Sequence, residues 1–283
     1  MECIAEVGAT LGEGPIWVAR EQALYWVDIP EKKLFRWTQA EGVRATEPAV
    51  HICSLAPRAG GGFIGGGYDG FLAIEGERIE RIGAPGPELP SNRFNDGKVD
   101  REGRFWAGTM DRFERDASGS LYRLDPDLSW TRIDSGYRVT NGPAFSLDGR
   151  TLYHTDSALQ RVYAFNLAAD GSVSNRRTFL QFGEGEGYPD GMTVDAEDCL
   201  WIAFWDGWCV RRFSPAGARL AELKTPVQRP TSCAFGGPDL DRLFITSASR
   251  GLGSDDLKMQ PNAGGLFMTM PGVKGVAEPL FAG

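Results

Sequence analysis

A side-chain oxygen stands directly before a glycine at four places, in Glu13-Gly14, Asn95-Asp96-Gly97, Asn141-Gly142 and Asp190-Gly191. Carboxylates and carboxamides without histidine or thiolate partners form hard, oxygen-only sites that suit Ca²⁺, Mg²⁺ or Mn²⁺. Two carboxylates enclosed in one small volume would repel each other, and a divalent ion removes that conflict. If Glu13, Asn141 and Asp190 converge, the sequence predicts a site for one divalent cation.

A competing interpretation is that these glycines simply make turns. Asn-Gly and Asp-Gly are common turn dipeptides, and each one taken alone is more typical of a turn than of a ligand. The proline that follows Gly14 and Gly142 strengthens that reading locally. Glu13 does not fit it, because glutamate is not a turn former. Recurrence of an oxygen at the same offset in four segments favours the convergent site.

Other residues near these positions suit a substrate. Arg93 and Asn95 lie two residues apart, so on an extended segment their side chains face the same side. An arginine and an amide beside a cation suit a polyhydroxylated substrate that carries a carbonyl. The alternative for Arg93 is a surface salt bridge. Four aromatic side chains near Asp190 either wall such a site or pack in the core: Tyr188, Phe204, Trp205 and Trp208.

Several mechanisms are excluded by what the chain lacks. Its only histidines are His51 and His154, which rules out a cluster of histidine ligands. We expect His154 to be a hydrogen-bonded core residue. There is no Gly-x-Ser-x-Gly motif, and no cysteine has a histidine partner in a recognisable signature. Nucleophilic serine and cysteine mechanisms are therefore set aside.

The elements that must position these residues repeat along the chain. The shared template is a Gly-led apolar strand, a tight turn, and a second strand with an aromatic residue near its start, followed by one or two further strands. Copies begin near residues 14, 97, 142, 191 and 231, with a degenerate copy at Gly62–Gly65. Six copies in 283 residues give about 47 residues each, as in four-stranded propeller blades. A β-sandwich would have no reason to repeat at this period.

The fold expected is therefore all-β, a six-bladed β-propeller with four-stranded antiparallel blades that forms a single domain over residues 1–283. The ring must close, because an open edge strand invites aggregation. We predict that the N-terminal strand near Cys3–Val7 pairs into the last blade. Inner strands line the axis of a propeller, which is why oxygens from several blades are expected to meet there.

Composition and charge limit the partners. The 30 lysines and arginines against 38 aspartates and glutamates give a net charge of −8, which argues against nucleic acid and against anionic membranes. No apolar stretch reaches the length of a membrane helix, and the first residues do not resemble a secretory signal. Five widely spaced cysteines, an odd number without a Cys-x-x-Cys, indicate reduced thiols. We therefore expect a cytoplasmic protein.

The sequence resembles the SMP-30/gluconolactonase/LRE-like family, to which regucalcin and the bacterial sugar lactonases belong. The resemblance spans nearly the whole chain and rests on motifs at residues 11–15 (LGEGP), 92–100 (NRFNDGKVD), 105–110 (FWAGTM), 140–142 (TNG) and 188–192 (YPDGM). It implies a six-bladed propeller that hydrolyses aldonolactones with one divalent cation, among Ca²⁺, Mg²⁺, Mn²⁺, Zn²⁺ and Fe²⁺. Residues 200–205 resemble the bacterial sugar lactonases more than the animal members.

The same resemblance implies roles for individual residues. Glu13, Asn141 and Asp190 would bind the metal, and Asp190 would also transfer the proton. Arg93 and Asn95 would contact the substrate. Family members place an acidic substrate contact shortly after the Gly-Thr-Met segment. Here that segment continues as Asp111-Arg112-Phe113-Glu114, so Glu114, or else Asp111, takes this place or neither does.

The function expected is that of a metal-dependent sugar lactonase, a carboxylic-ester hydrolase of the gluconolactonase type. It would convert a pentono- or hexonolactone to the aldonic acid and work as a monomer or weak homodimer. Two alternatives stay open. The same scaffold suits a phosphotriesterase-like hydrolase, and it also suits a non-catalytic, calcium-binding protein of the regucalcin type.

Overall fold

The computed structural model describes residues 1–86 and 89–283, and in them the chain forms six four-stranded antiparallel sheets. These sheets are the blades of a six-bladed β-propeller, as the repeats predict. The described residues hold one short α-helix, α1 (Ser254–Met259), and two 3₁₀ turns at Ala19–Glu21 and Ser157–Leu159. None of the described helices is long and apolar enough to cross a membrane.

The chain divides into two compact units of three blades each. Unit 1 comprises residues 1–51 and 182–277, and unit 2 comprises residues 52–181 and 278–283. Whether they act as the single domain expected from the repeats stays a prediction.

Unit 1 contains the first, fifth and sixth blades. Their strands are β2 (Gly12–Val18), β3 (Ala23–Asp28), β4 (Lys33–Thr38) and β5 (Gly42–Thr46); β18 (Tyr188–Val194), β19 (Leu200–Trp205), β20 (Cys209–Phe213) and β21 (Arg219–Lys224); and β22 (Pro230–Gly236), β23 (Arg242–Ser247), β24 (Leu266–Thr269) and β1 (Glu2–Ala5). The inner strand β22 packs beside both β2 and β18.

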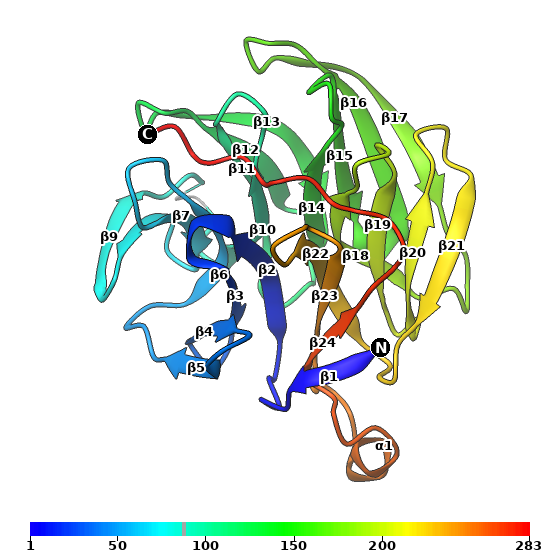
Figure 1. Cartoon of the computed structure of the whole chain (residues 1–283). Helices are drawn as coiled ribbons and strands as arrows, with labels where there is room; N and C mark the ends of the chain where they lie inside the picture. The colour runs from blue at the N-terminus through cyan, green and yellow to red at the C-terminus, as the bar shows by residue number, and fades with distance from the viewer. Residues whose placement is uncertain (87–88) are drawn as a thin grey trace. The chain divides into compact units, whose positions relative to one another are not determined.

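The N-terminal strand completes the last blade, as predicted. β1 pairs antiparallel with β24, with Glu2 opposite Met268 and Cys3 opposite Phe267, and Figure 1 shows the two strands side by side. The edge of β24 is thereby covered by a strand from the other end of the chain.

Unit 2 contains the second, third and fourth blades. Their strands are β6 (Ile52–Pro57), β7 (Phe63–Gly67), β8 (Phe71–Glu75) and β9 (Arg78–Gly83); β10 (Asn92–Val99), β11 (Phe105–Asp111), β12 (Gly119–Leu124) and β13 (Trp130–Tyr137); and β14 (Thr140–Phe145), β15 (Thr151–Asp156), β16 (Arg161–Leu167) and β17 (Val173–Gln181). The inner strand β10 packs beside both β6 and β14.

The second blade corrects one prediction. Its inner strand is β6, and the Gly62–Gly65 segment read as the start of that copy belongs instead to the turn and the second strand, β7. β6 has no lead glycine, and neither has the sixth copy, which starts at Thr231. β6 reads as a short apolar run, Ile-Cys-Ser-Leu-Ala-Pro, whereas the glycines to which the template was aligned lie in the following turn and in β7.

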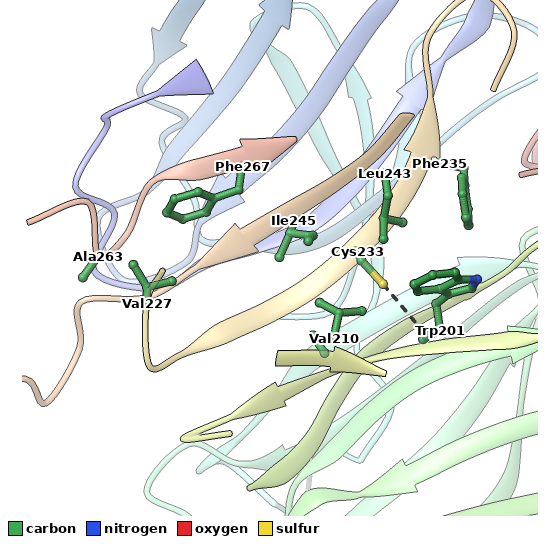
Figure 2. Close-up of a cluster of buried hydrophobic side chains, with 10 residues drawn as sticks. Trp201, Val210, Val227, Cys233, Phe235, Leu243, Ile245, Ala263 and Phe267 are labelled. Atoms are coloured by element: carbon green, nitrogen blue, oxygen red, sulfur yellow. Dashed lines mark hydrogen bonds between the residues drawn. The ribbon is translucent and has the colours of Figure 1, made fainter. Parts of the chain in front are cut away.

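Large apolar side chains fill the space between neighbouring sheets. In unit 1, Trp201, Phe235, Leu243 and Phe267 belong to one buried cluster, drawn in Figure 2. In unit 2, Trp106, Tyr137 and Phe145 belong to another. Inner strands are buried over most of their length, whereas the outer strands β5 and β17 expose most of their residues. Burial on both faces explains the apolar and small residues of the inner strands.

Candidate functional site

Every inner strand carries a β-bulge near its first residues, with one residue more than its partner strand. In four blades the irregularity falls at the oxygen-bearing positions, between Glu13 and Ile16, Phe94 and Gly97, Asn141 and Ala144, and Pro189 and Met192. In the other two it falls between Ile52 and Ser54 and between Pro230 and Ser232. A bulge breaks the strict alternation of side chains and so re-aims a residue, which is why bulges occur next to active sites.

In unit 2 the structure brings three of the predicted residues together. Arg93 Nη1 donates to Asn95 Oδ1 at 2.7 Å, and Asn95 Nδ2 donates to Asn141 Oδ1 at 3.0 Å. Asn95 Nδ2 also donates to the carbonyl of Thr140 at 2.7 Å. All of these side chains are buried. They form one hydrogen-bonded chain from the third blade to the fourth.

Arg93 is a buried arginine and not the surface salt bridge considered as its alternative. Arg93 is only 5% exposed. Nη1 donates to the carbonyl of Phe94 at 2.8 Å and lies 3.9 Å from the Cys53 sulfur, while the guanidinium lies 5.7 Å from the ring centroid of Tyr68. Within the described residues no carboxylate lies within ion-pair distance of it. A buried guanidinium held by neutral groups keeps hydrogen-bonding capacity for a ligand.

The amide of Asn141 is oriented by its neighbours. Nδ2 donates to Ser157 Oγ at 2.9 Å, while Oδ1 accepts from Asn95. An amide oxygen has two lone pairs, so one acceptor direction of Oδ1 is still available after the contact with Asn95. This is the kind of support that orients a metal-binding oxygen.

Asp96 stands at the same offset as Glu13, Asn141 and Asp190, one residue before a glycine. Its Oδ1 accepts from the Gly97 N–H at 2.8 Å. Burial raises the pKa of Asp96 to about 6, although the charge of Lys98 and the hydrogen bond from the Gly97 N–H act in the opposite direction.

In unit 1, Glu13 and Asp190 lie at the bulges of β2 and β18, the two strands that flank β22. Both are buried. Glu13 Oε2 accepts from the N–H of Gly14 at 3.1 Å. Thr231, at the bulge of β22, donates from Oγ1 to the carbonyl of Gly12 at 2.5 Å and so ties β22 to the residue before Glu13.

The two acidic candidates after the Gly-Thr-Met segment behave differently. Asp111 is fully buried and accepts from the N–H groups of Phe113 and Arg115, so its carboxylate caps the turn that follows β11. Glu114 lies exposed in that turn with a positive φ of 58°. Of the two, only Glu114 is placed to reach a ligand from solvent, and its role stays a prediction.

The aromatic residues near Asp190 divide between the two roles considered for them. Phe204 is fully buried, with its ring edge-on to Phe182 at 4.8 Å. Trp205 lies under the guanidinium of Arg229. Tyr188 and Trp208 are 42% and 40% exposed. Packing is therefore the role of Phe204, whereas Tyr188 and Trp208 can contact a ligand.

His154 is a core residue of the second strand, β15, as predicted, but the expected hydrogen bond is not found. Neither ring nitrogen has a hydrogen-bond partner within the described residues. The ring lies edge-on to Tyr137, with centroids 4.8 Å apart. Burial lowers the pKa of His154 to about 3, and the positive charge of Arg176 adds to this effect.

Sequence reasoning missed several residues around these positions. Cys53 and Tyr68 come from the second blade, whose inner strand the repeat template misplaced. Ser157 and Thr231 are small hydroxyl residues with no distinguishing neighbours in the sequence. The one available signal is positional, because Thr231 starts the sixth copy of the repeat.

The chemistry of the donor set fits a hard cation. In residues 1–86 and 89–283 no three His, Cys, Asp or Glu side chains cluster as a metal site. Unit 1 carries the buried carboxylates of Glu13 and Asp190 at its bulges, and unit 2 carries the buried amide oxygen of Asn141. Oxygen-only donors of this kind suit Ca²⁺, Mg²⁺ or Mn²⁺.

Comparison with known proteins places the chain in a family. The family model described as SMP-30/Gluconolactonase/LRE-like region matches residues 11–249. The chain belongs to this family. The resemblance inferred from the motifs is thereby confirmed.

Relatives of known name match this chain over nearly their full length. The chain is 39% identical over 294 residues to regucalcin from Xenopus laevis, which covers 100% of this chain and 98% of the relative. It is 37% identical over 287 residues to 6-deoxy-6-sulfogluconolactonase from Pseudomonas putida, covering 100% and 99%. A crystal structure of a calcium-binding regucalcin from Agrobacterium tumefaciens superposes with a TM-score of 0.94 at 29% identity, covering 99% and 96%. The family thus contains both lactonases and regucalcins.

Proposed function

We propose that this chain is a sugar lactonase, a carboxylic-ester hydrolase that opens an aldonolactone to the aldonic acid. The observation that carries the proposal is the buried chain of hydrogen bonds from Arg93 through Asn95 to Asn141. Membership of a family that includes a sulfogluconolactonase supports it.

Arg93 and Asn95 hold the hydroxyl groups of the sugar. Arg93 has a planar fork of donors, of which only Nη1 is engaged by the contacts described above. A polyol offers oxygen acceptors in the same plane, and a bound sugar ring is fixed in one orientation when two or more of them are engaged. Glu114, on the exposed turn after β11, is proposed as a further substrate contact.

Glu13, Asn141 and Asp190 are the residues proposed to hold one divalent cation. Their support is the equivalent offset at a bulge, their burial and the oxygen-only chemistry. The calcium-binding regucalcin with the same fold agrees with a hard ion. When bound, such an ion supplies positive charge that polarises an ester carbonyl.

Asp190 is proposed as the proton-transfer residue. Its carboxylate takes a proton from the attacking water, whose oxygen bonds to the carbonyl carbon. The bond between that carbon and the ring oxygen then breaks, and Asp190 returns the proton to the ring oxygen. The products are one carboxylic acid and one hydroxyl group, so one water is consumed per ring opened.

The test is a panel of pentono- and hexonolactones assayed by acid release. Metal-stripped protein is refilled with Ca²⁺, Mg²⁺, Mn²⁺, Zn²⁺ or Fe²⁺ in turn, and the spontaneous hydrolysis of each lactone is subtracted. We expect turnover of at least one lactone that depends on the added ion. An ion that binds without any turnover would favour the non-catalytic calcium-binding alternative, and turnover of organophosphates alone would favour the phosphotriesterase.

A further inference from the structure

Asp28 and Asp156 occupy the same place in two different blades. Each is buried and is the last residue of a second strand, β3 in the first blade and β15 in the fourth. Asp28 lies opposite Gly12 in the pair of β2 and β3, and Asp156 lies opposite Thr140 in the pair of β14 and β15. Each aspartate therefore lies opposite the residue that directly precedes a proposed cation ligand.

In the first blade, the carboxylate holds the segment that leads into the inner strand. Asp28 Oδ2 accepts from the N–H of Thr10 at 2.8 Å, and its Oδ1 accepts from the N–H of Leu11 at 3.1 Å. The carbonyl of Leu11 accepts from the N–H of Ile29 at 3.2 Å. Three hydrogen bonds thus fix the chain just before Glu13.

The fourth blade has the same three hydrogen bonds at the same positions. Asp156 Oδ2 accepts from the N–H of Arg138 at 3.0 Å, and its Oδ1 accepts from the N–H of Val139 at 3.3 Å. The carbonyl of Val139 accepts from the N–H of Ser157 at 2.9 Å. These bonds fix the chain just before Asn141.

The bulges explain why the chain needs to be fixed here. The regular pairing of β2 and of β14 is interrupted directly after Glu13 and Asn141. A shift of one residue in the pairing of a strand sends each side chain to the other face of the sheet. A carboxylate that accepts two consecutive N–H groups determines which residues precede the bulge, and so determines the face to which the next side chains point.

The residue after each aspartate matches the ligand beside it. Ser157 Oγ accepts from Asn141 Nδ2 at 2.9 Å. The equivalent residue of the first blade is Ile29, which is apolar and buried. There the ligand is Glu13, whose carboxylate has no N–H group that needs an acceptor. The end of the second strand is thus adapted to an amide in one blade and to a carboxylate in the other.

We propose that Asp28 and Asp156 are positioning residues, which set the pairing of the two bulged strands so that Glu13 and Asn141 present their oxygens to a cation. This inference rests on the proposed function, since the roles of Glu13 and Asn141 as ligands are part of that function. Neither Asp28 nor Asp156 is assigned as a ligand.

The experiment titrates the metal-free protein with Ca²⁺, and in parallel with Mn²⁺, in a calorimeter. It compares the unaltered chain with Asp28→Asn, Asp156→Asn and the double variant. Asparagine has nearly the same shape but presents one acceptor and an NH₂ group, so one N–H of each pair loses its partner. Loss of a residue that orients a metal ligand typically weakens metal binding about 10- to 100-fold, and we expect about tenfold for each single variant.

The double variant tests whether each aspartate acts on its own ligand. Within the described residues Asp28 and Asp156 share no hydrogen-bond partner. The two losses should therefore multiply, to about 100-fold.

The matched control is Asp100→Asn. Asp100 is also buried and also accepts two backbone N–H groups, those of Glu102 and Arg104, but it follows the end of β10 and not the start of an inner strand. Urea denaturation should show that this variant loses at least as much free energy of unfolding as the single test variants. We expect it to bind the cation within about twofold of the unaltered chain.

The outcomes are distinct. A cation affinity within about twofold of normal in folded Asp28→Asn or Asp156→Asn overturns the proposal for that blade, and where one variant fails to fold the other still decides its own blade. An equal loss of affinity in Asp100→Asn overturns the proposal as a whole, because general destabilisation would then explain the result. An unaltered chain that binds neither ion refutes the cation site of the proposed function and this inference with it. Normal binding by the unaltered chain and by both variants refutes the inference alone.

Discussion

Strands β10 and β18 each have one buried aspartate at the bulge, Asp96 or Asp190. A second buried aspartate, Asp100 or Asp195, directly follows the last residue of each strand. The carboxylates at these two ends of the strands have different partners. After the strands, Asp100 and Asp195 each accept two backbone N–H groups and also bind a tryptophan and an arginine. The side-chain contacts are Trp106 Nε1 and Arg104 Nε at 2.7 Å for Asp100, and Trp201 Nε1 at 2.8 Å and Arg212 Nε at 2.7 Å for Asp195.

At the bulge end, Asp96 accepts from the backbone N–H of Gly97, and within the described residues no lysine or arginine nitrogen lies within 4 Å of it. Burial without a close cation disfavours the charged form. The pKa of Asp96 is raised accordingly. We therefore expect that the carboxylates after the strands stabilise the blades, whereas the residues at the bulges serve the proposed site.

The strongest test of this contrast uses the two aspartates of β18. We expect Asp190→Asn to lower kcat for a sugar lactone about 1,000-fold, because the residue proposed to move the proton can no longer do so. The free energy of unfolding should change by less than about 1 kcal/mol. Steady-state acid release and urea denaturation measure the two effects. The contrast breaks if Asp190→Asn turns over at the normal rate.

The partner variant Asp195→Asn should show the opposite pattern. Arg212, which is mostly buried, loses its charged partner, and such a loss costs about 3 kcal/mol. Arg212 keeps Glu197 as a second partner, which limits the loss. Urea denaturation should give this decrease while kcat stays within about twofold of normal. A stable but inactive Asp195→Asn would contradict this comparison, because Asp195 would then serve the reaction as Asp190 is proposed to do.

His154 extends the comparison to a buried titratable group outside the bulges. Neither of its ring nitrogens has a hydrogen-bond partner within the described residues. Its pKa of about 3 lies below the usual value near 6.5. Between these values the unfolded chain binds a proton on His154 and the folded chain does not. The free energy of unfolding therefore falls as pH falls, by about 2 kcal/mol from pH 6.5 to 5.

The measurement is urea denaturation at several pH values for the unaltered chain and for His154→Leu. In His154→Leu the free energy of unfolding should lose the pH dependence due to His154 and keep the pH dependence due to carboxylates. Identical slopes for the two chains would contradict the assignment of the slope to His154.

The smallest effect is expected at Arg93, at the bulge end of β10. In Arg93→Lys the charge is kept and the planar fork is lost, so we expect KM for the lactone to rise about tenfold. The value of kcat should change less than about threefold, since Arg93 binds the sugar and does not move a proton. A fall in kcat with unchanged KM would place Arg93 in the chemical step.

Much of the fold could be predicted because the blade is a local unit. Alternating strand patterns, tight turns and lead glycines recur about every 47 residues, and each is decided within one copy. The exception was β6, whose short apolar run has no glycine and no polar alternation. Such a run gives no periodic signal that separates an inner strand from other buried segments.

The site could be predicted only in part. The residue types and offsets of Glu13, Asn95, Asn141 and Asp190 are visible in the sequence, because acidic and amide residues stand out before a glycine. Asp111 shows the limit, since nothing in its neighbours reveals that the carboxylate caps a turn. Ser157 and Tyr68 could not be found, because their distance along the chain from Asn141 and Arg93 says nothing about contact.

The sequence by itself determined that the chain is built from repeated β units, that its net charge is negative and that its polar donors are oxygens. These properties depend on composition and on near neighbours along the chain. Only the tertiary structure decided that Arg93 is buried, with no acidic partner in the described part of the chain, and that Asn95 reaches Asn141 on the next blade. Such contacts join residues about 45 positions apart, and they exist only after neighbouring sheets have packed and bulges have re-aimed the side chains.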